Sequence, residues 1–316
     1  MPDPSKDSVT WIEIDENAEN QRIDNFLLRH LKGVPKSHIY RILRSGEVRV
    51  NSGRIGAEYR LAIGDRIRVP PVRVAKTLPR PRHAPAHHRL AARILYQDDA
   101  LLAIDKPAGL AVHGGSGVSL GGVEQLRLEF SEFKFLELAH RLDKETSGVL
   151  LLAKKRSALL ALHAMMRDGA VDKRYLTLVA GAWRNERQSV KFSLTKYLTA
   201  DGERRVAVDE QGQDSHTVFY LIEKLQKYSL LEAELKTGRT HQIRVHLAHL
   251  GFPIAGDDKY GDFALNKLLA RQGLKRMFLH AHRVEFPHPI SGLPIEITAP
   301  MAPDLAAFVT RLRSLI

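Results

Sequence analysis

The stretch "HRLDKETSGVLLLAK" (residues 140–154) joins a cluster of charged residues to a run of apolar ones. Its last part, Val149–Ala153, is a short apolar segment bounded by turn-forming residues, which is typical of a strand buried on both faces. The charged part precedes this segment and ends in Thr146-Ser147-Gly148. The sequence therefore predicts that Asp143 lies on a loop at the mouth of a buried strand.

Asp143 has two positively charged neighbours in the sequence, Arg141 and Lys144, and Arg244 is available from a later segment. Because nearby cations favour the ionised form of a carboxyl group, we expect Asp143 to be charged at neutral pH. A fixed carboxylate suits a nucleophile or a group that stabilises a developing cation, and it does not suit a general acid. Taken alone, an aspartate in such surroundings is more often part of a structural ion pair.

Three other classes of site find less support in the sequence. A glycosidase needs two carboxyl groups in opposite protonation states, and Glu145, like Asp143, sits beside cations. His241 and His246 are five residues apart, unlike the pair of a zinc-binding helix, and His280 and His282 lack supporting carboxylates. The phosphate-binding and dinucleotide-binding glycine patterns are absent. We therefore expect no metal and no nucleotide cofactor.

The composition is that of a globular protein, with 44% hydrophobic and 27% charged residues among 316. This length favours two domains. There is no cysteine, so disulfides and thiolate metal sites are excluded. No apolar stretch is long enough for a membrane span, and the polar first twenty residues do not resemble a secretion signal. We expect a cytoplasmic protein, and the low aromatic content without a coiled-coil pattern favours a monomer.

Positive charge is concentrated near the N-terminus. Residues 22–82 hold fifteen Lys and Arg against four Asp and Glu, an excess of 11 out of a net charge of +12. Such an asymmetry favours a module that binds a polyanion, and we interpret the polyanion as nucleic acid. Two helices and a small β-ribbon are predicted here by apolar spacing and turn residues. The residues expected on the outer surface of the helices, and hence in contact with RNA, are Arg29, Lys32, Lys36, Arg41 and Arg44.

The remainder of the chain alternates strands with a few scattered helices, which predicts an α+β fold. The segment "KTGRTHQIRVHLAHLG" (residues 236–251) predicts a helix capped by Thr240. We expect an N-terminal extension over 1–20, an RNA-binding domain over 21–76, a Pro- and Arg-rich linker over 77–92 and a catalytic domain over 93–316.

One ionised carboxylate, no cofactor and an RNA-binding module together suit the isomerisation of a nucleoside, which involves no net redox change. The base must first leave the helical stack, which costs a few kcal/mol. Arg141 could fill the gap by stacking on neighbouring bases, with His140 beside it. Tyr175 could hold the flipped base.

Four segments resemble motifs of the RluA-type pseudouridine synthases. They are "HRLDKETSGVLLLAK", "DKRYLTLVAG", "KTGRTHQIRVHLAHLGFPIAGDDKYG" and "AIDKPAGLAVHGGSG". The resemblance implies that Asp143 is the catalytic aspartate, Tyr175 the active-site tyrosine and Arg244 the arginine that pairs with the aspartate. The N-terminal helices and ribbon resemble the S4 RNA-binding domain over about residues 21–70.

The resemblance further implies a bent, mostly antiparallel mixed sheet with an RNA cleft. It implies that the substrate is a set of uridines in 23S ribosomal RNA, free or in large-subunit assembly intermediates, and that no metal or organic cofactor is required. Attack of the aspartate on C1′, attack on the pyrimidine ring and a glycal route all remain open. A non-catalytic RNA-binding or ribosome-assembly factor and an N-glycosidase are the alternative functions.

Overall fold

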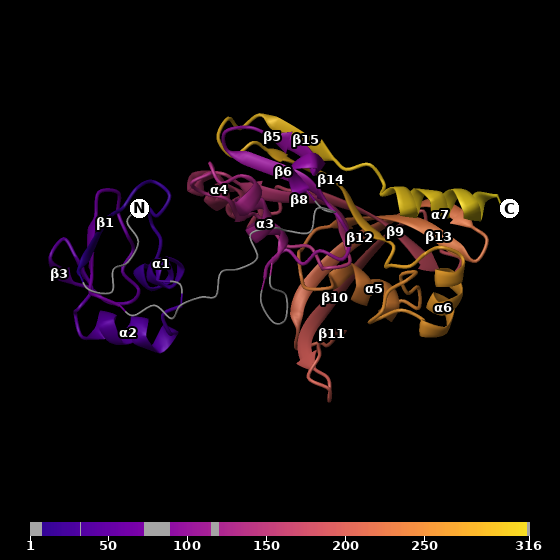
Figure 1. The fold of residues 1–316 in the computed structure, drawn as a ribbon. Coiled ribbons are helices and arrows are strands. Elements are labelled where there is room, and N and C mark those ends of the chain that lie inside the picture. Colours follow the sequence, from indigo (N-terminus) through magenta and orange to yellow (C-terminus); the bar gives the residue numbers. More distant parts are fainter. Residues whose placement is uncertain (1–7, 32, 73–88, 115–119, 315–316) are drawn as a thin grey trace. The chain divides into compact units, whose positions relative to one another are not determined.

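The computed structural model describes residues 8–31, 33–72, 89–114 and 120–314 (Figure 1). The chain divides into two compact units, Met1–His88 and Arg89–Ile316, and each is treated by itself. Lys32 and most of the expected linker lie outside the described residues. Within the described part, no helix combines the length and the apolar content that crossing a bilayer would need.

The N-terminal unit packs two helices, α1 (Ile23–His30) and α2 (Lys36–Arg44), on a small antiparallel sheet. The strand order is β1-β4-β2-β3, from β1 (Thr10–Glu13), β4 (Arg66–Val69), β2 (Arg49–Val50) and β3 (Gly53–Arg54). Asn51 and Ser52 both have positive φ, as the two-residue hairpin turn between β2 and β3 requires. The apolar residues at helical spacing in α1 and α2 are buried, so their prediction is confirmed.

Residues 10–14, which we expected in an N-terminal extension, belong to this unit instead. Strand β1 pairs with β4 along its whole length, from Thr10 opposite Val69 to Glu13 opposite Arg66. Its residues alternate between buried and exposed, and Ile12 and Ile14 lie in the core of the unit. The strand therefore adds apolar side chains to the core that lies between the sheet and the two helices.

The second unit is built on a mixed, mostly antiparallel sheet of 11 strands, which confirms the predicted fold class. Nine strands follow one path, β11-β10-β12-β13-β9-β14-β8-β6-β5, while β15 pairs with β14 and β7 with β8. The strands are β5 (Ile94–Gln97), β6 (Leu101–Lys106), β7 (Glu137–Leu138), β8 (Ser147–Ala153), β9 (Asp172–Ala180), β10 (Arg187–Leu198), β11 (Arg204–Val208), β12 (Gln213–Leu225), β13 (Tyr228–Leu235), β14 (Leu279–Pro287) and β15 (Pro294–Thr298). Among the described strands, β14 and β8 form the one parallel pair.

Strand β8 is buried on both faces, as its apolar run predicts. Leu150 and Leu152 point into the larger core of the unit, whereas Val149, Leu151 and Ala153 point into a second one. Helices α3 (Gly122–Glu129), α5 (Gln242–His249), α6 (Phe263–Arg271) and α7 (Pro303–Arg313) contribute to the larger core, and α4 (Arg156–Arg167) to the second. The sheet therefore has a covered layer on each side of β8, which gives the loop before β8 a rigid base.

The unit begins before residue 93, where we expected the linker to end. The short helix η2 (Leu90–Arg93) leads into β5, and Leu90 is fully buried in the larger core. The carboxylate of Glu129 at the end of α3 accepts hydrogen bonds from the Leu90 and Ala91 amides, at 3.2 and 2.7 Å. Residues 89–92 are therefore part of this unit, because their backbone and one apolar side chain are held by it.

Candidate active site

The loop between β7 and β8 carries Asp143, whose side chain is 27% exposed. The Thr146 amide donates a hydrogen bond to the backbone carbonyl of Asp143 at 3.2 Å and closes the turn. Gly148, at the start of β8, has φ +105°, and a Cβ there would lie 2.1 Å from the carbonyl oxygen of Ala281 on β14. The aspartate is therefore placed by a tight turn in front of the parallel strand pair.

Two side chains, half-buried His140 and fully buried Lys106, hold this loop to the sheet. Nε2 of His140 accepts a hydrogen bond from the Leu151 amide at 3.1 Å. The ammonium of Lys106, which is fully buried, donates to the carbonyl of Lys144 at 3.0 Å and to the carbonyls of Pro107 and Leu110 at 2.9 Å. Because these bonds fix the backbone on both sides of residue 143, the carboxylate has little freedom to move.

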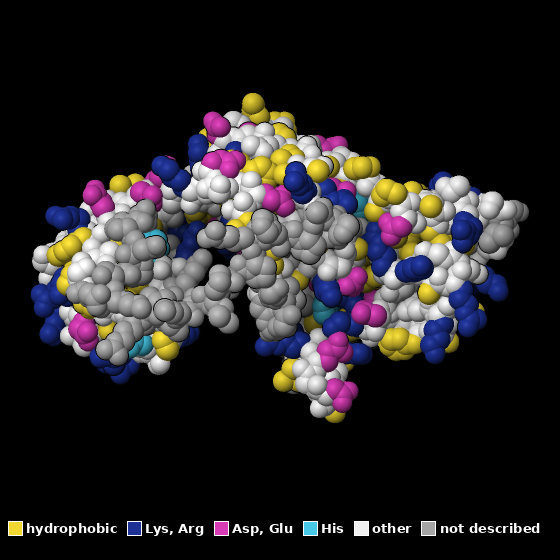
Figure 2. Space-filling model, viewed as in Figure 1, with side chains coloured by type: hydrophobic (Ala, Val, Ile, Leu, Met, Phe, Trp, Pro, Cys, Tyr) yellow, Lys and Arg dark blue, Asp and Glu magenta, His cyan; other side chains and the backbone are white. Residues whose placement is uncertain are grey.

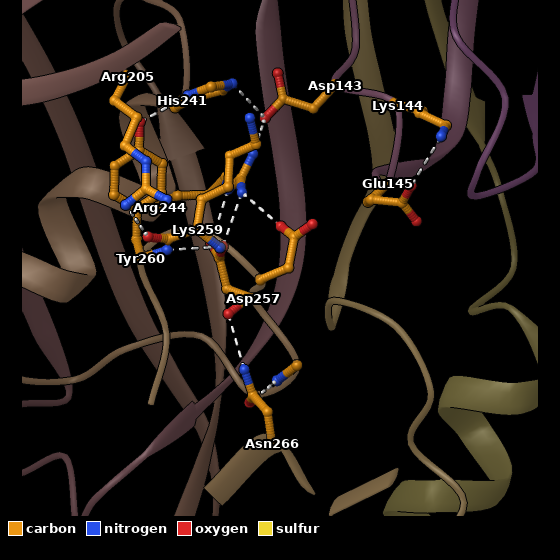
Figure 3. A network of polar contacts seen from close by, with 12 residues as sticks. Asp143, Lys144, Glu145, Arg205, His241, Arg244, Asp257, Lys259, Tyr260 and Asn266 are labelled. Atoms are coloured by element: carbon orange, nitrogen blue, oxygen red, sulfur yellow. Dashed lines mark hydrogen bonds and ion pairs between the residues drawn. The ribbon is translucent and has the colours of Figure 1, made fainter. Parts of the chain in front are cut away.

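Arg244, in the first turn of α5, contacts the carboxylate of Asp143 (Figure 3). Its Nη1 donates to Oδ2 of Asp143 at 3.0 Å, across 101 residues of sequence. Its Nε and Nη2 donate to the two carboxylate oxygens of Asp257, both at 2.7 Å. Only 3% of Arg244 is exposed, so the guanidinium is a buried bridge between two carboxylates.

The Asp257 carboxylate anchors this bridge. It is fully buried and also accepts hydrogen bonds from the Lys259 and Tyr260 amides, at 2.8 and 3.1 Å. Burial alone would raise the pKa of Asp257, but the hydrogen bonds and charge of Arg244 outweigh it and lower that pKa below its ordinary value. Burial likewise opposes the charge on Arg244, whereas Asp257 and then Asp143 raise its pKa above the usual range. The two charges are therefore held as an ion pair at neutral pH.

His241 and Tyr260 complete the surroundings of Asp143 (Figure 3). Nε2 of His241 lies 3.8 Å from Oδ2 of Asp143, and its Nδ1 lies 2.8 Å from the hydroxyl of Tyr260. The guanidinium of Arg244 lies 5.1 Å from the centre of the Tyr260 ring. Within the part of the chain that the structure describes, the contacts of Asp143 with Arg244 and His241 both fall on Oδ2, which leaves Oδ1 to meet another molecule.

The start of α5 differs from the prediction. His241, not Thr240, occupies the cap position, with left-handed backbone angles (φ 54°, ψ 18°), and no side chain caps the helix from that position. Instead, the Oε1 of Gln242 accepts the Arg239 amide at 2.9 Å and the Thr237 hydroxyl at 2.8 Å. The prediction of a Thr240 cap is therefore wrong, because the preceding loop is held by an amide side chain inside the helix.

Tyr175 lies on the strand next to the site. It is 6% exposed, on β9, and its neighbours across the sheet are Ala233 and Ala281. Burial, and after it the negative charge of Asp143, raises the pKa of Tyr175 above its ordinary value. The structure therefore brings Asp143, Arg244 and Tyr175 together, although they come from three separate segments of the sequence.

The other residues predicted in the loop of Asp143 have different surroundings. Arg141 is exposed. His140 is half-buried, and burial, followed by the charge of Lys173, lowers its pKa to about 4, so its ring is neutral. Lys144 does not pair with Asp143 but lies 4.0 Å from Glu145. Arg141 and Lys144 thus both carry charge on the exposed part of the loop that holds Asp143.

The basic residues predicted to contact RNA lie on the two helices of the N-terminal unit. Arg29, Lys36, Arg41 and Arg44 are exposed, and Lys32 is outside the described residues. Figure 2 shows Lys and Arg side chains on the rim of this unit. Arg41 has an acidic neighbour, Glu47, at 3.4 Å. The helices therefore present positive charge to solvent over an apolar core.

The histidines considered as metal ligands face separate partners. His280 is fully buried, with Nδ1 2.9 Å from the Ser147 hydroxyl, whereas His282 lies 3.0 Å from Glu232. Among the residues that the structure describes, no group of three or more His, Asp or Glu side chains is arranged to hold a metal ion.

Asp257 and Tyr260 were not singled out from the sequence, and His241 was considered there only as a metal ligand. All three fall within the third motif, and a signal was present in "AGDDKYG", where Gly256 has φ +79° and is followed at once by two carboxylates. The identity of the partner of each carboxylate depends on the tertiary fold.

Comparison with known proteins places this geometry in context. Residues 100–249 match the RNA pseudouridylate synthase family, and residues 21–67 match the S4 domain. The chain is 49% identical to ribosomal large subunit pseudouridine synthase C of Pasteurella multocida (strain Pm70) over 312 residues, covering 97% of this chain and 94% of that protein. It is 49% identical to the protein of the same name from Escherichia coli (strain K12) over 314 residues, covering 97% and 98%.

A solved structure has a similar fold. Human RNA pseudouridylate synthase domain containing 4 superimposes with a TM-score of 0.59 at 25% identity, covering 71% of this chain and 94% of that one.

Proposed function

The chain belongs to the RNA pseudouridylate synthase family, and from this membership we propose that it converts specific uridines of large-subunit (23S) ribosomal RNA into pseudouridine. The names of the relatives that are 49% identical along nearly the whole chain support the substrate. The S4 domain supports an RNA substrate, either free or in an assembly intermediate. The observation that carries the chemical part is the contact between Arg244 and Oδ2 of Asp143 at 3.0 Å.

Asp143 acts in this proposal as the reacting carboxylate. Arg244 holds Oδ2, which fixes the carboxylate and leaves Oδ1 for the uridine. A charged, fixed carboxylate can attack the sugar or the pyrimidine ring as a nucleophile, or remove a proton as a base. Because Arg244 is itself held by Asp257 through two bonds of 2.7 Å, the carboxylate is already oriented before the RNA binds.

Arg141 and Tyr175 serve the flipped base. A uridine must leave the stack before its glycosidic bond becomes accessible, at a cost of a few kcal/mol. Arg141 is exposed and lies two residues before Asp143 in the same loop, so its guanidinium can stack in the gap that the base leaves. Tyr175, on β9 and within reach of the charge of Asp143, can pack its aromatic ring against the uracil.

The test replaces Asp143 by asparagine, which keeps the shape and removes the charge. We expect Asp143→Asn to lose pseudouridine formation by about 10³-fold or more, while RNA affinity stays within about twofold. Pseudouridine mapping across the ribosomal RNA of a strain that carries only this form measures the first quantity, and direct RNA binding measures the second. Glu145→Gln is the matched control, since Glu145 is a neighbouring carboxylate that pairs with Lys144, and it should remain active.

Three outcomes would contradict the proposal. An active Asp143→Asn protein, with deamidation back to aspartate excluded, would show that the charge is dispensable. Loss of the protein that left every pseudouridine in place but disturbed subunit assembly would indicate an assembly factor. Release of free uracil from the RNA would indicate an N-glycosidase.

A further inference from the structure

His241 has an unusual backbone for a residue with a side chain. It lies at the junction between the loop after β13 and helix α5, with φ 54° and ψ 18°. Left-handed angles are unfavourable for residues with a Cβ, and glycine or asparagine is the usual occupant. Such a conformation persists only where the surroundings determine it, and it is found more often at functional sites than elsewhere. Here the backbone turn directs the imidazole towards Asp143 (Figure 3).

The hydrogen bonds of Tyr260 indicate which nitrogen of His241 carries the proton. The Tyr260 hydroxyl oxygen accepts a hydrogen bond from the Val206 amide at 2.9 Å. Its own hydrogen is then available for Nδ1 of His241, 2.8 Å away. A neutral imidazole that accepts at Nδ1 must carry its proton on Nε2. This is the nitrogen that faces Asp143.

Nε2 of His241 points towards Oδ2 of Asp143, which already accepts one hydrogen bond from Arg244. Nε2 of His241 lies 3.8 Å from Oδ2 of Asp143, the same oxygen that accepts from Arg244 at 3.0 Å. A separation of 3.8 Å is longer than a hydrogen bond. Hydrogen bonds among catalytic groups are often long before the substrate binds and shorten in the complex. A small movement of the imidazole would give Oδ2 a second donor.

The charges around His241 favour its neutral form. Burial lowers the pKa of His241 below its ordinary value, and the cations Arg244 and Lys259 act in the same direction. The negative charges of Asp143 and Asp257 oppose this shift without reversing it. The imidazole is therefore uncharged at neutral pH and offers Asp143 a donor that leaves the carboxylate ionised.

We propose that His241 is a positioning residue for Asp143. Tyr260 holds His241 as its Nε2–H tautomer, and this Nε2–H donates a hydrogen bond to Oδ2 of Asp143 when the uridine is bound. Arg244 and His241 then fix Oδ2 from two directions, and the carboxylate can no longer rotate. Oδ1 alone is presented to the uridine in one orientation. The proposal rests on the role of Asp143 proposed above, and it adds a second residue and a tyrosine that acts through it.

The first experiment measures the tautomer directly in the full-length protein. ¹⁵N NMR spectra of histidine-labelled protein at pH 7 distinguish a protonated from an unprotonated ring nitrogen. We expect the His241 signals, assigned by their loss in His241→Asn, to show an unprotonated Nδ1 and a protonated Nε2. In Tyr260→Phe, which lacks the hydroxyl that donates to Nδ1, the fraction of His241 in the Nε2–H form should decrease. A protonated Nδ1 or a doubly protonated ring in the unsubstituted protein would overturn the proposal, whether or not any variant is stable.

The second experiment is a double-mutant cycle on pseudouridine formation in an unmodified transcript of 23S ribosomal RNA. His241→Asn preserves the left-handed backbone and removes the Nε2–H group, because the shorter amide side chain has no atom at that position, so we expect kcat to fall by about 10²-fold while the Kd for RNA stays within about twofold. Tyr260→Phe retains the ring next to Arg244 and should lower kcat by about 10-fold. The double variant should be no slower than His241→Asn, since Tyr260 acts through His241. Independent, multiplying losses would refute this coupling.

The matched controls lie elsewhere in the same unit. His288 lies 2.8 Å from Asp98, and the Tyr96 hydroxyl donates to Asp98 at 2.8 Å. His288→Asn and Tyr96→Phe therefore remove the same kinds of group at positions that do not contact Asp143. Both controls should keep the unsubstituted kcat. If Asp143→Asn is inactive but His241→Asn has full activity, only the positioning role is wrong. If Asp143→Asn is active, the proposed function itself fails.

Discussion

Arg244 uses three nitrogens to hold the carboxylates of Asp143 and Asp257, with Asp258 a further 3.5 Å contact, and a lysine could not reproduce this pattern. A lysine keeps one positive charge but has no planar fork, so it cannot satisfy both oxygens of Asp257 and reach Asp143 together. We expect Arg244→Lys to lower kcat by about 10²-fold and to destabilise the unit by roughly 2–4 kcal/mol, because the buried Asp257 loses donors. Urea unfolding and pseudouridine formation measure the two effects.

Arg313 supplies the control for this substitution. It forms an exposed ion pair with Glu223 at 2.6 Å, and exposed pairs contribute little to stability. Arg313→Lys should therefore change neither stability nor activity measurably. If Arg244→Lys were equally silent, the fork geometry would not matter, and charge alone would explain the role of Arg244.

At the scale of single residues, the sequence predicted the site in part. Asp143 and Arg244 were expected to pair, and they lie 3.0 Å apart, whereas Tyr175 is close enough for the charge of Asp143 to raise its pKa. The main partner of Arg244, however, is Asp257, which lies 13 residues further along the chain. Sequence reasoning shows that a buried arginine needs carboxylates, but it cannot say which ones fold next to it. The contacts of His241 and Tyr260 were missed for the same reason.

At the scale of elements, predictions succeeded where a pattern extended over several residues and failed at the ends of elements. Strand β8 follows from five consecutive apolar residues, each of which gains by burial. The start of α5 depends on one amide side chain, Gln242, and on a left-handed residue before it. Glutamine is not a usual capping residue, so no local rule could identify this start.

The connection of β8 to the preceding loop should depend on pH through His140. Its ring accepts the Leu151 amide while neutral, and its pKa is lowered from 6.5 to about 4. The unfolded chain therefore binds more protons than the folded protein between these values, and stability falls as pH decreases from 6.5 to 4. We expect His140 to account for a loss on the order of 2 kcal/mol over this range.

Unfolding in urea at several pH values measures this loss. His140→Gln can still offer an acceptor to the Leu151 amide but does not titrate, so its stability should change less between pH 6.5 and 4 than that of the unsubstituted protein. His38→Gln is the control, because His38 lies on α2 in the N-terminal unit, away from this loop. Equal pH dependence in His140→Gln and the unsubstituted protein would show that His140 is not the titrating group.

For the molecule as a whole, the sequence predicted the uneven distribution of charge between the two units better than it predicted where each unit begins and ends. An excess of 11 positive charges over residues 22–82 is visible without any structure. The boundaries depend on single contacts: β1 belongs to the N-terminal unit through its pairing with β4, and Leu90 belongs to the second unit through its burial. Neither contact can be recognised from composition, because each segment is only four residues long and changes an average of charge or hydropathy very little.

This charge division predicts how RNA affinity responds to salt. Each phosphate contact that is lost should reduce the slope of log K against log salt by about 0.7–0.9. Removing the exposed charges of α2 in the full chain, as Lys36→Ala, Arg41→Ala and Arg44→Ala together, should therefore lower the slope by about 2–3 and weaken binding. At saturating RNA the kcat should remain unchanged, since these residues belong to the other unit than Asp143.

A control with the same change in net charge separates a local from a global effect. Lys267, Arg271 and Lys275, on α6 and just after it, are also exposed, and their triple alanine variant removes three charges from the second unit. If the helices of the N-terminal unit bind the phosphates, only the α2 variant loses slope. An equal loss in both variants would mean that RNA responds to the overall charge of the molecule, and the S4 domain would then have no special part in affinity.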